Sequence, residues 1–191
     1  LLALVNYVSK ELGLDPNPAF SGVIINEVDV DADIQKRPSV PLDVINAVQQ
    51  RCYQMDDEAR WAIALVSDTG LRLSEALGLV KDDVILDDPA PHLVVRSHPW
   101  RRLKTSASAR KVPLVGAALW AAQRASALSP SPCMFSRYCS PEGCKGNSAS
   151  GALNKWLKPM MPKGCVIHSF RHSFRDRLRA VQCPKDITDR L

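Results

Sequence analysis

The stretch from 165 to 181 carries two helical patterns side by side. Phe170, Phe174, Leu178 and Val181 recur at helical spacing, so one face of a helix over 165–179 is predicted to lie in a core. A second set recurs at i, i+3, i+4 and i+7 along the edge of that face: His168, Arg171, His172 and Arg175. Such a row of imidazole and guanidinium groups suits a polyanion, but a solvated basic face on an ordinary surface helix explains it equally well.

The N-terminal residues, 1–37, have a different hydrophobic and polar pattern from residues 38–191. Apolar residues over 2–12 predict a short amphipathic helix that ends near Gly13, where Asp15-Pro-Asn-Pro breaks it. Residues 15–38, which contain an acidic run and then Lys-Arg-Pro, are typical of an extended linker. We therefore expect a boundary that separates 1–37 from a main domain over 38–191.

The main domain opens with helices. Ser39 or Pro41 begins the first, and Asp56–Asp68 forms a second that is nearly apolar and so largely buried. This second helix is expected to stop at Thr69-Gly70, because a glycine can adopt the left-handed conformation that ends a helix. The chain then returns to a helical pattern over 71–79.

Short strands and further helices follow. The predicted strands are Val84–Leu86, His92–Arg96 and Lys111–Leu114, with a basic turn over 100–110. The predicted helices are Gly116–Leu128 and Ser150–Met161, separated by a polar loop over 130–150. The pattern predicts an α+β fold that is mostly helical, with a small antiparallel β-sheet.

Charge is distributed unevenly along the chain. Residues 1–88 carry seven Lys and Arg against 16 Asp and Glu, whereas residues 89–191 carry 18 against four. No acidic residue occurs between Pro89 and Pro141. The C-terminal half is therefore a candidate nucleic-acid surface.

Other classes of protein fit the sequence less well. No stretch reaches the roughly 18 apolar residues of a membrane span, and Leu1–Val5 is too short for a signal peptide. We expect a cytoplasmic protein with no membrane partner. Its six cysteines lack the close pairs of common zinc sites, so reduced, metal-free thiols are expected. The chain begins at Leu and ends at Leu191 within a helical pattern, and we expect a piece of a longer protein.

Arg72 is the first residue whose position in the sequence indicates a specific chemistry. It lies between two hydrophobic helices, where an arginine is costly unless it is paired, and Glu75 is the nearest acid in sequence. The surrounding segment, Thr-Gly-Leu-Arg-Leu-Ser-Glu-Ala-Leu, resembles the first arginine motif of the phage-integrase family of tyrosine recombinases. In that family the arginine contacts the scissile phosphate and the acid three residues later supports it.

Two further segments match the same family in order and spacing. Lys104-Thr, followed by a basic residue and Val-Pro-Leu, is similar to the β-hairpin that carries the catalytic lysine. His168-Ser-Phe-Arg171-His172 resembles the His-x-x-Arg-His motif, with Phe170 where an aliphatic residue is more usual. The resemblance covers about 38–191 as the catalytic domain, and 1–14 looks like the last helix of the preceding DNA-clamping domain.

The resemblance implies DNA strand breakage and rejoining through a 3′-phosphotyrosine, without a cofactor or a metal. It implies that Arg72, Lys104, His168 and Arg171 are catalytic, with Glu75 and His172 supporting them. The expected DNA contacts are basic residues elsewhere: Arg101, Arg102, Arg110, Lys145 and Lys155. Double-stranded DNA is the expected partner, bound in the nucleoid by a homotetramer of the longer protein and by a monomer of this piece.

The expected nucleophile is missing from the matching part. The tyrosines are Tyr7, Tyr53 and Tyr138, all upstream of His168, and a later His or Trp that would bind the phosphate is also absent. We expect both beyond Leu191, so that this piece is inactive by itself. Two alternatives stay open: a non-catalytic DNA-binding module with the same basic face, and a type IB topoisomerase.

Overall fold

The computed structural model describes residues 11–13, 38–103 and 108–191. The chain divides into two units, Leu1–Lys36 and Arg37–Leu191. Of the first unit, the structure describes only Glu11–Gly13, where Gly13 has a φ of 62° at the end of a helical turn. The assignment of residues 1–37 to a clamping domain and linker stays a prediction, because it falls almost wholly outside the described residues.

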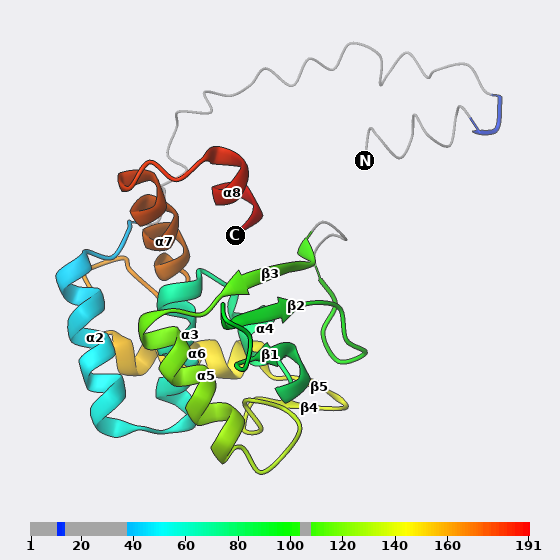
Figure 1. Cartoon of the computed structure of the whole chain (residues 1–191), viewed down its shortest axis with the longest axis horizontal. Helices are drawn as coiled ribbons and strands as arrows, with labels where there is room; N and C mark the ends of the chain where they lie inside the picture. The colour runs from blue at the N-terminus through cyan, green and yellow to red at the C-terminus, as the bar shows by residue number, and fades with distance from the viewer. Residues whose placement is uncertain (1–10, 14–37, 104–107) are drawn as a thin grey trace. The chain divides into compact units, whose positions relative to one another are not determined.

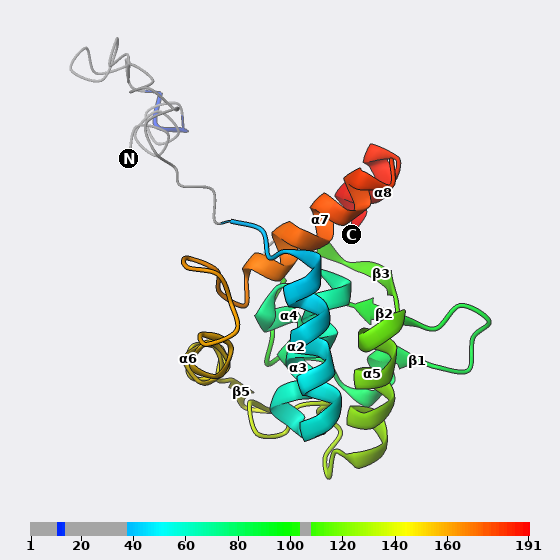
Figure 2. The same cartoon turned by 90° about the vertical axis from the view of Figure 1, so that its left-hand side faces the viewer.

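Helix α3 (Glu58–Thr69) is the centre of the second unit. The side chain of Asp57 caps its N-terminus by accepting a hydrogen bond from the Arg60 amide at 3.0 Å. Its side chains are buried on almost every side, as the apolar sequence predicts. Helices α2 (Leu42–Met55), α5 (Gly116–Leu128) and α7 (Ser169–Ala180) pack against it (Figures 1 and 2).

Gly70 ends α3 in the left-handed conformation, with a φ of 62°. A Cβ atom at this position would lie 2.6 Å from the Phe174 ring of α7, so the backbone approaches α7 more closely than any other residue type allows. The chain leaves this turn in an extended conformation and forms the short helix α4 (Leu73–Leu77). The predicted helix stop is confirmed, and it places the start of α4 beside α7.

A three-stranded antiparallel sheet lies at one edge of the helical body (Figure 1). After the 3-10 turn η2 (Lys81–Asp83), its strands follow in the order β1 (Val84–Ile85), β2 (His92–Val95) and β3 (Arg110–Pro113). Leu93 of β2 pairs with Val84 and with Val112, and Leu93 and Val112 face the core. The predicted strands are confirmed, with ends that differ by at most one residue.

The segment predicted as a polar loop holds a second, two-stranded sheet. Strand β4 (Cys139–Ser140) pairs with β5 (Gly143–Cys144), and helix α6 (Gly146–Leu157) follows directly. Helix α6 thus begins and ends four residues earlier than Ser150–Met161. Its start is set by the hairpin, whose last pair leads into a hydrogen bond from the Lys145 amide to the Tyr138 carbonyl at 2.7 Å.

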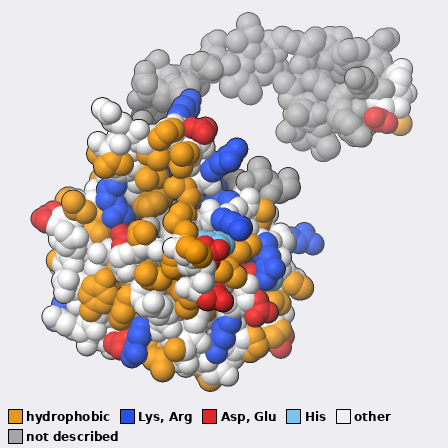
Figure 3. Space-filling model, in the orientation of Figure 1, with side chains coloured by type: hydrophobic (Ala, Val, Ile, Leu, Met, Phe, Trp, Pro, Cys, Tyr) orange, Lys and Arg blue, Asp and Glu red, His pale blue; other side chains and the backbone are white. Residues whose placement is uncertain are grey.

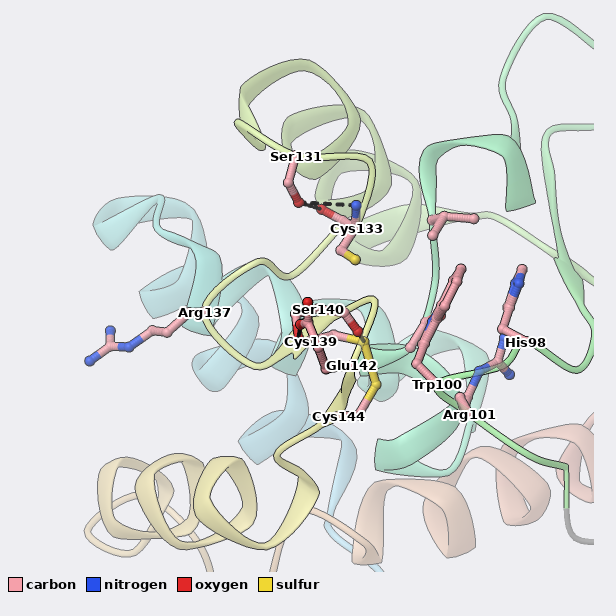
Figure 4. Close-up of a disulfide and its surroundings, with 12 residues drawn as sticks. His98, Trp100, Arg101, Ser131, Cys133, Arg137, Cys139, Ser140, Glu142 and Cys144 are labelled. Carbon is pink, nitrogen blue, oxygen red and sulfur yellow. Dashed lines mark hydrogen bonds between the residues drawn. A yellow bond between two sulfur atoms is a disulfide. The ribbon is translucent and has the colours of Figure 1, made fainter.

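The hairpin corrects the expectation that all six thiols are reduced. Cys139 and Cys144 form a disulfide, because the register of β4 and β5 places them directly opposite each other with their Cα atoms 4.2 Å apart (Figure 4). The bond packs beside Trp100 and the buried Cys133 thiol. Cys52, Cys133, Cys165 and Cys183 are free thiols. Within residues 11–13, 38–103 and 108–191, no group of three or more His, Cys, Asp or Glu is arranged to hold a metal ion.

Helix α7 is buried over a shorter length than its sequence predicts. Phe170 is fully buried and Phe174 is half-buried against α3, but Val181 is 74% exposed. The physical reason is that α7 continues past the end of α3 toward the last helix, α8 (Lys185–Arg190) (Figure 2). A strip of hydrophobic side chains is visible at the level of α7 and α8 (Figure 3). None of the helices in the described part of the chain is long and apolar enough to cross a membrane.

Candidate active site

Arg72 occupies the N-cap position of α4, immediately after the left-handed turn at Gly70. Its guanidinium Nη1 donates to Glu75 Oε1 at 2.7 Å, and its main-chain amide donates to Glu75 Oε2 at 3.1 Å. Glu75 therefore caps the first turn of α4 and pairs with Arg72 at the same time. The pairing that the sequence predicts for Arg72 is confirmed.

Glu75 is shared with a second arginine that arrives from the sheet. Arg110, the first residue of β3, donates from Nη2 to Glu75 Oε2 at 2.9 Å. Burial raises the pKa of the Glu75 carboxyl, but the hydrogen bonds and charges of Arg110 and then Arg72 outweigh burial and hold the pKa below its usual range. Glu75 is thus ionised at neutral pH although it is only 3% exposed.

Arg171 joins this cluster from the first turn of α7. Its Nη1 donates to the Gly70 carbonyl, so the turn that ends α3 also fixes this arginine. Burial lowers the pKa of Arg171, and the nearby charges of Arg72 and Arg110 lower it further, whereas Glu75 opposes them. Burial is the larger cause, and a bound anion would offset both it and the repulsion from the neighbouring arginines.

The three arginines line one cavity of about 230 Å³, together with Ser108 and the end of α8. Asp189 is the acid in its described lining and is paired with Arg175 at 2.8 Å, while Glu75 bonds to Arg72 and Arg110 behind it. The cavity therefore presents guanidinium groups in excess of carboxylates. Such a planar, always charged donor can give two parallel hydrogen bonds to one phosphate.

His168 lines a second hollow, which Arg72 also lines. It precedes α7, is exposed, and its ring lies 5.3 Å from the His172 ring in an edge-to-face arrangement. This hollow, of about 310 Å³, is also lined by Arg72, Ser74 and the first turns of α6. Arg72 thus connects the predicted residues: it pairs with Glu75, shares one hollow with Arg171 and lines the other with His168. His172 is placed only beside the His168 ring. Lys104 lies outside the described residues.

Three of the five predicted DNA contacts lie on the surface. Arg102, Lys145 and Lys155 are exposed. Arg110 instead faces the arginine cavity, with its side chain only 10% exposed. A sequence signal for this position exists, because Arg110 is in phase with the buried Val112 and Leu114 along the strand.

Arg101 needs a correction, because its side chain is 2% exposed and cannot serve as a surface contact. Its guanidinium Nη2 lies 3.9 Å from the Oδ2 atom of Asp83, a fully buried carboxylate. The tight turn from His98 to Arg101 directs the side chain inward, through paired main-chain hydrogen bonds of 3.0 Å and packing over Gly78. Arg101 therefore belongs to the structure that holds this turn.

The Asp83 carboxylate also binds two other side chains of the segment that leaves β2. Arg96 Nε donates to Asp83 Oδ1 at 2.7 Å, and His98 Nε2 lies 2.7 Å from Asp83 Oδ2. His98 in turn stacks on Trp100, with the two rings 4.6 Å apart and nearly parallel. Asp83 thus fixes the segment that leaves β2 through its contacts with three side chains. Nothing in the sequence pattern predicts this role.

No family model matches this sequence, and no curated protein matches it. Solved structures do match in fold. The chain is similar to the Tn1549 transposon integrase in complex with circular intermediate DNA, with a TM-score of 0.66 and 20% identity over 98% of this chain and 66% of that one. It is also similar to XerH site-specific recombinase bound to a palindromic difH substrate, with a TM-score of 0.68 and 15% identity over 99% and 56%.

XerA recombinase gives a third match, with a TM-score of 0.60 and 14% identity over 99% of this chain and 63% of that one. The chain thus spans two thirds or less of the length of these structures. Such likeness establishes the fold: a mostly helical α+β domain with a small antiparallel sheet at one edge, which is the fold of the tyrosine recombinase catalytic domain. The fold class predicted from the sequence is confirmed.

Proposed function

We propose that this chain is the catalytic domain of a tyrosine recombinase, which breaks and rejoins DNA at specific sites through a 3′-phosphotyrosine. The observation that carries the proposal is the cluster of Arg72 and Arg171 around the buried Glu75, beside His168. These are the residues whose motifs resemble the family's. The fold shared with the Tn1549 integrase and XerH, both solved with DNA, supports the same conclusion.

The proposed chemistry follows from the charge that develops at phosphorus. Attack on a phosphodiester builds negative charge on the non-bridging oxygens, and fixed donors aimed at that charge supply most of the acceleration. Arg72 and Arg171 are held by Glu75 and by the Gly70 carbonyl, so they need little rearrangement to receive a phosphate. Lys104 is proposed to protonate the departing 5′ oxygen, and His168 to assist proton transfer or orient the nucleophile.

Neither described tyrosine suits the role of nucleophile. Tyr53 packs edge-to-face on Trp120, with ring centroids 4.6 Å apart, and burial raises the pKa of its hydroxyl. Tyr138 is 6% exposed, and neither residue lines the two hollows around Arg72. We propose that the nucleophile follows Leu191, whose main-chain oxygen accepts a hydrogen bond from Arg110 Nε at 3.2 Å at the cavity. The longer protein is proposed to act as a tetramer on DNA.

Covalent capture of DNA tests this function. Duplexes would be selected from a random library by binding to the longer protein and then incubated with it, and the mixture denatured. We expect protein covalently joined to a 3′ phosphate, with a free 5′ hydroxyl on the other strand end, because stabilising the transition state leads to cleavage only when a nucleophile is present. The 191-residue chain, as control, should bind the same duplexes without forming the adduct.

A longer protein that binds its selected duplexes but yields no adduct would favour the non-catalytic DNA-binding module instead. An adduct with relaxation of supercoiled plasmid, and without exchange between two selected sites, would favour a type IB topoisomerase. The outcome that supports the proposal is an adduct together with recombinant products.

Arg102→Ala is expected to weaken binding of this chain to all duplexes alike and to reduce the salt slope by about one phosphate contact. Arg102 is exposed, whereas Arg101 is buried, so Arg101→Ala should leave the salt slope unchanged. Anisotropy titrations of a labelled duplex at several KCl concentrations measure both. Equal slopes for wild type and Arg102→Ala would remove Arg102 from the interface.

A further inference from the structure

Arg110 is held more completely than either of its neighbours in the cavity. Its Nη2 donates to Glu75 Oε2 at 2.9 Å, its Nη1 to the Ser108 carbonyl at 2.8 Å, and its Nε to the Leu191 main-chain oxygen at 3.2 Å. Three of its five N–H groups are thus occupied by acceptors that surround one planar group. An arginine with three directed hydrogen bonds fixes the positions of the groups that accept them.

Glu75 is the important partner of Arg110, because its two carboxylate oxygens accept hydrogen bonds from different groups. Oε1 accepts from the guanidinium of Arg72 at 2.7 Å, whereas Oε2 accepts from the Arg72 amide and from Arg110. Arginine and a carboxylate ordinarily favour a fork in which two parallel N–H groups meet two oxygens. Since the Arg72 amide and Arg110 occupy Oε2, the guanidinium of Arg72 meets Glu75 through one N–H only.

We propose that Arg110 is a positioning residue for the phosphate site: it holds the Glu75 carboxylate so that Arg72 keeps its remaining N–H groups free for the scissile phosphate. This inference rests on the proposed function and adds to it a residue that the sequence places among the outer DNA contacts. Without Arg110, Glu75 would turn to meet Arg72 as a fork. Arg72 would then keep its charge but direct fewer donors at the phosphate.

Arg110→Lys in the longer protein separates this role from a general attraction for DNA. The charge is retained, so DNA affinity and its salt dependence should stay near wild type. An ammonium group cannot meet three acceptors around one plane, so the strand-cleavage rate of the bound complex should fall about 10- to 100-fold. Arg124→Lys is the matched control, because Arg124 is likewise paired with a carboxylate, Asp56, but lines neither of the hollows around Arg72.

A double-mutant cycle tests whether Arg110 acts through Glu75. If it does, the losses of cleavage rate in Arg110→Lys and Glu75→Gln should not multiply, and the double variant should resemble the worse single variant. Guanidinium ion at millimolar concentration should restore part of the rate to Arg110→Ala but none to Arg110→Lys, where the space is filled. Thermal unfolding of each variant shows whether the fold is retained.

A measurement on the 191-residue chain needs no catalysis. The hydrogen bond and charge of Arg110 lower the pKa of Glu75, so Arg110→Met should raise that pKa, as followed by NMR of the side-chain carboxyl. Arg124→Met should leave it unchanged.

Two results would each overturn the inference: a wild-type cleavage rate in the bound complex of Arg110→Lys, or losses that multiply with those of Glu75→Gln. Absence of any cleavage by the wild-type longer protein would instead contradict the proposed function on which the inference rests. The NMR measurement distinguishes failure of the inference from failure of the proposed function, since it reports the interaction between Arg110 and Glu75 whether or not the longer protein cleaves DNA.

Discussion

Arg171→Lys in the longer protein is expected to slow strand cleavage by about 100-fold or more, while DNA affinity stays close to wild type. Removing one fixed donor from a developing oxyanion costs about that much in other enzymes. Lysine keeps the charge but loses the paired hydrogen bonds and the contact with the Gly70 carbonyl that orients Arg171. Single-turnover cleavage at saturating protein, with affinity measured separately, gives the two quantities.

Arg179→Lys is the matched control for this experiment, because Arg179 lies on the same helix and its side chain is 65% exposed. It should cleave at the wild-type rate. If Arg171→Lys also cleaved at the wild-type rate, the catalytic interpretation of α7 would fail, and the DNA-binding module would take its place.

Lys104→Ala should slow cleavage of ordinary DNA by about 10²- to 10⁴-fold, the range for loss of a general acid. The defect should largely disappear on a substrate whose bridging 5′ oxygen is replaced by sulfur, because a thiolate leaves without a proton. Rates on the two substrates, compared in wild type and variant, measure the proton transfer directly. The same defect on both substrates would show that Lys104 is not the general acid.

The sequence was sufficient for the parts of the site that local chemistry dictates. A glycine after an apolar helix predicted the turn, and an arginine next to that turn predicted a paired acid, which is Glu75. The spacing of His168 and Arg171 predicted that both lie along one edge of a helix, and the structure places Arg171 in the first turn of α7 and His168 at its N-cap. Each of these features depends on residues within a few positions of one another, where backbone geometry alone decides the contact.

Features that depend on distant neighbours could not be predicted in the same way. Arg101 and Arg102 are adjacent and chemically identical, yet the turn buries one and exposes the other. The disulfide needed the register of a two-stranded hairpin, which a separation of five residues does not determine. Val181 continues an apolar pattern but extends past the helix that buries Phe170.

The backbone at Gly70 determines how Arg72 and Arg171 are placed relative to each other. Its carbonyl binds Arg171, its backbone packs closely against the Phe174 ring, and Arg72 follows two residues later. The positions of the Arg72 and Arg171 guanidinium groups therefore both depend on the backbone at Gly70, and in the proposed enzyme this one turn would set their separation at the phosphate. In that enzyme we expect the separation between the Arg72 and Arg171 guanidinium groups to be the same with and without bound DNA.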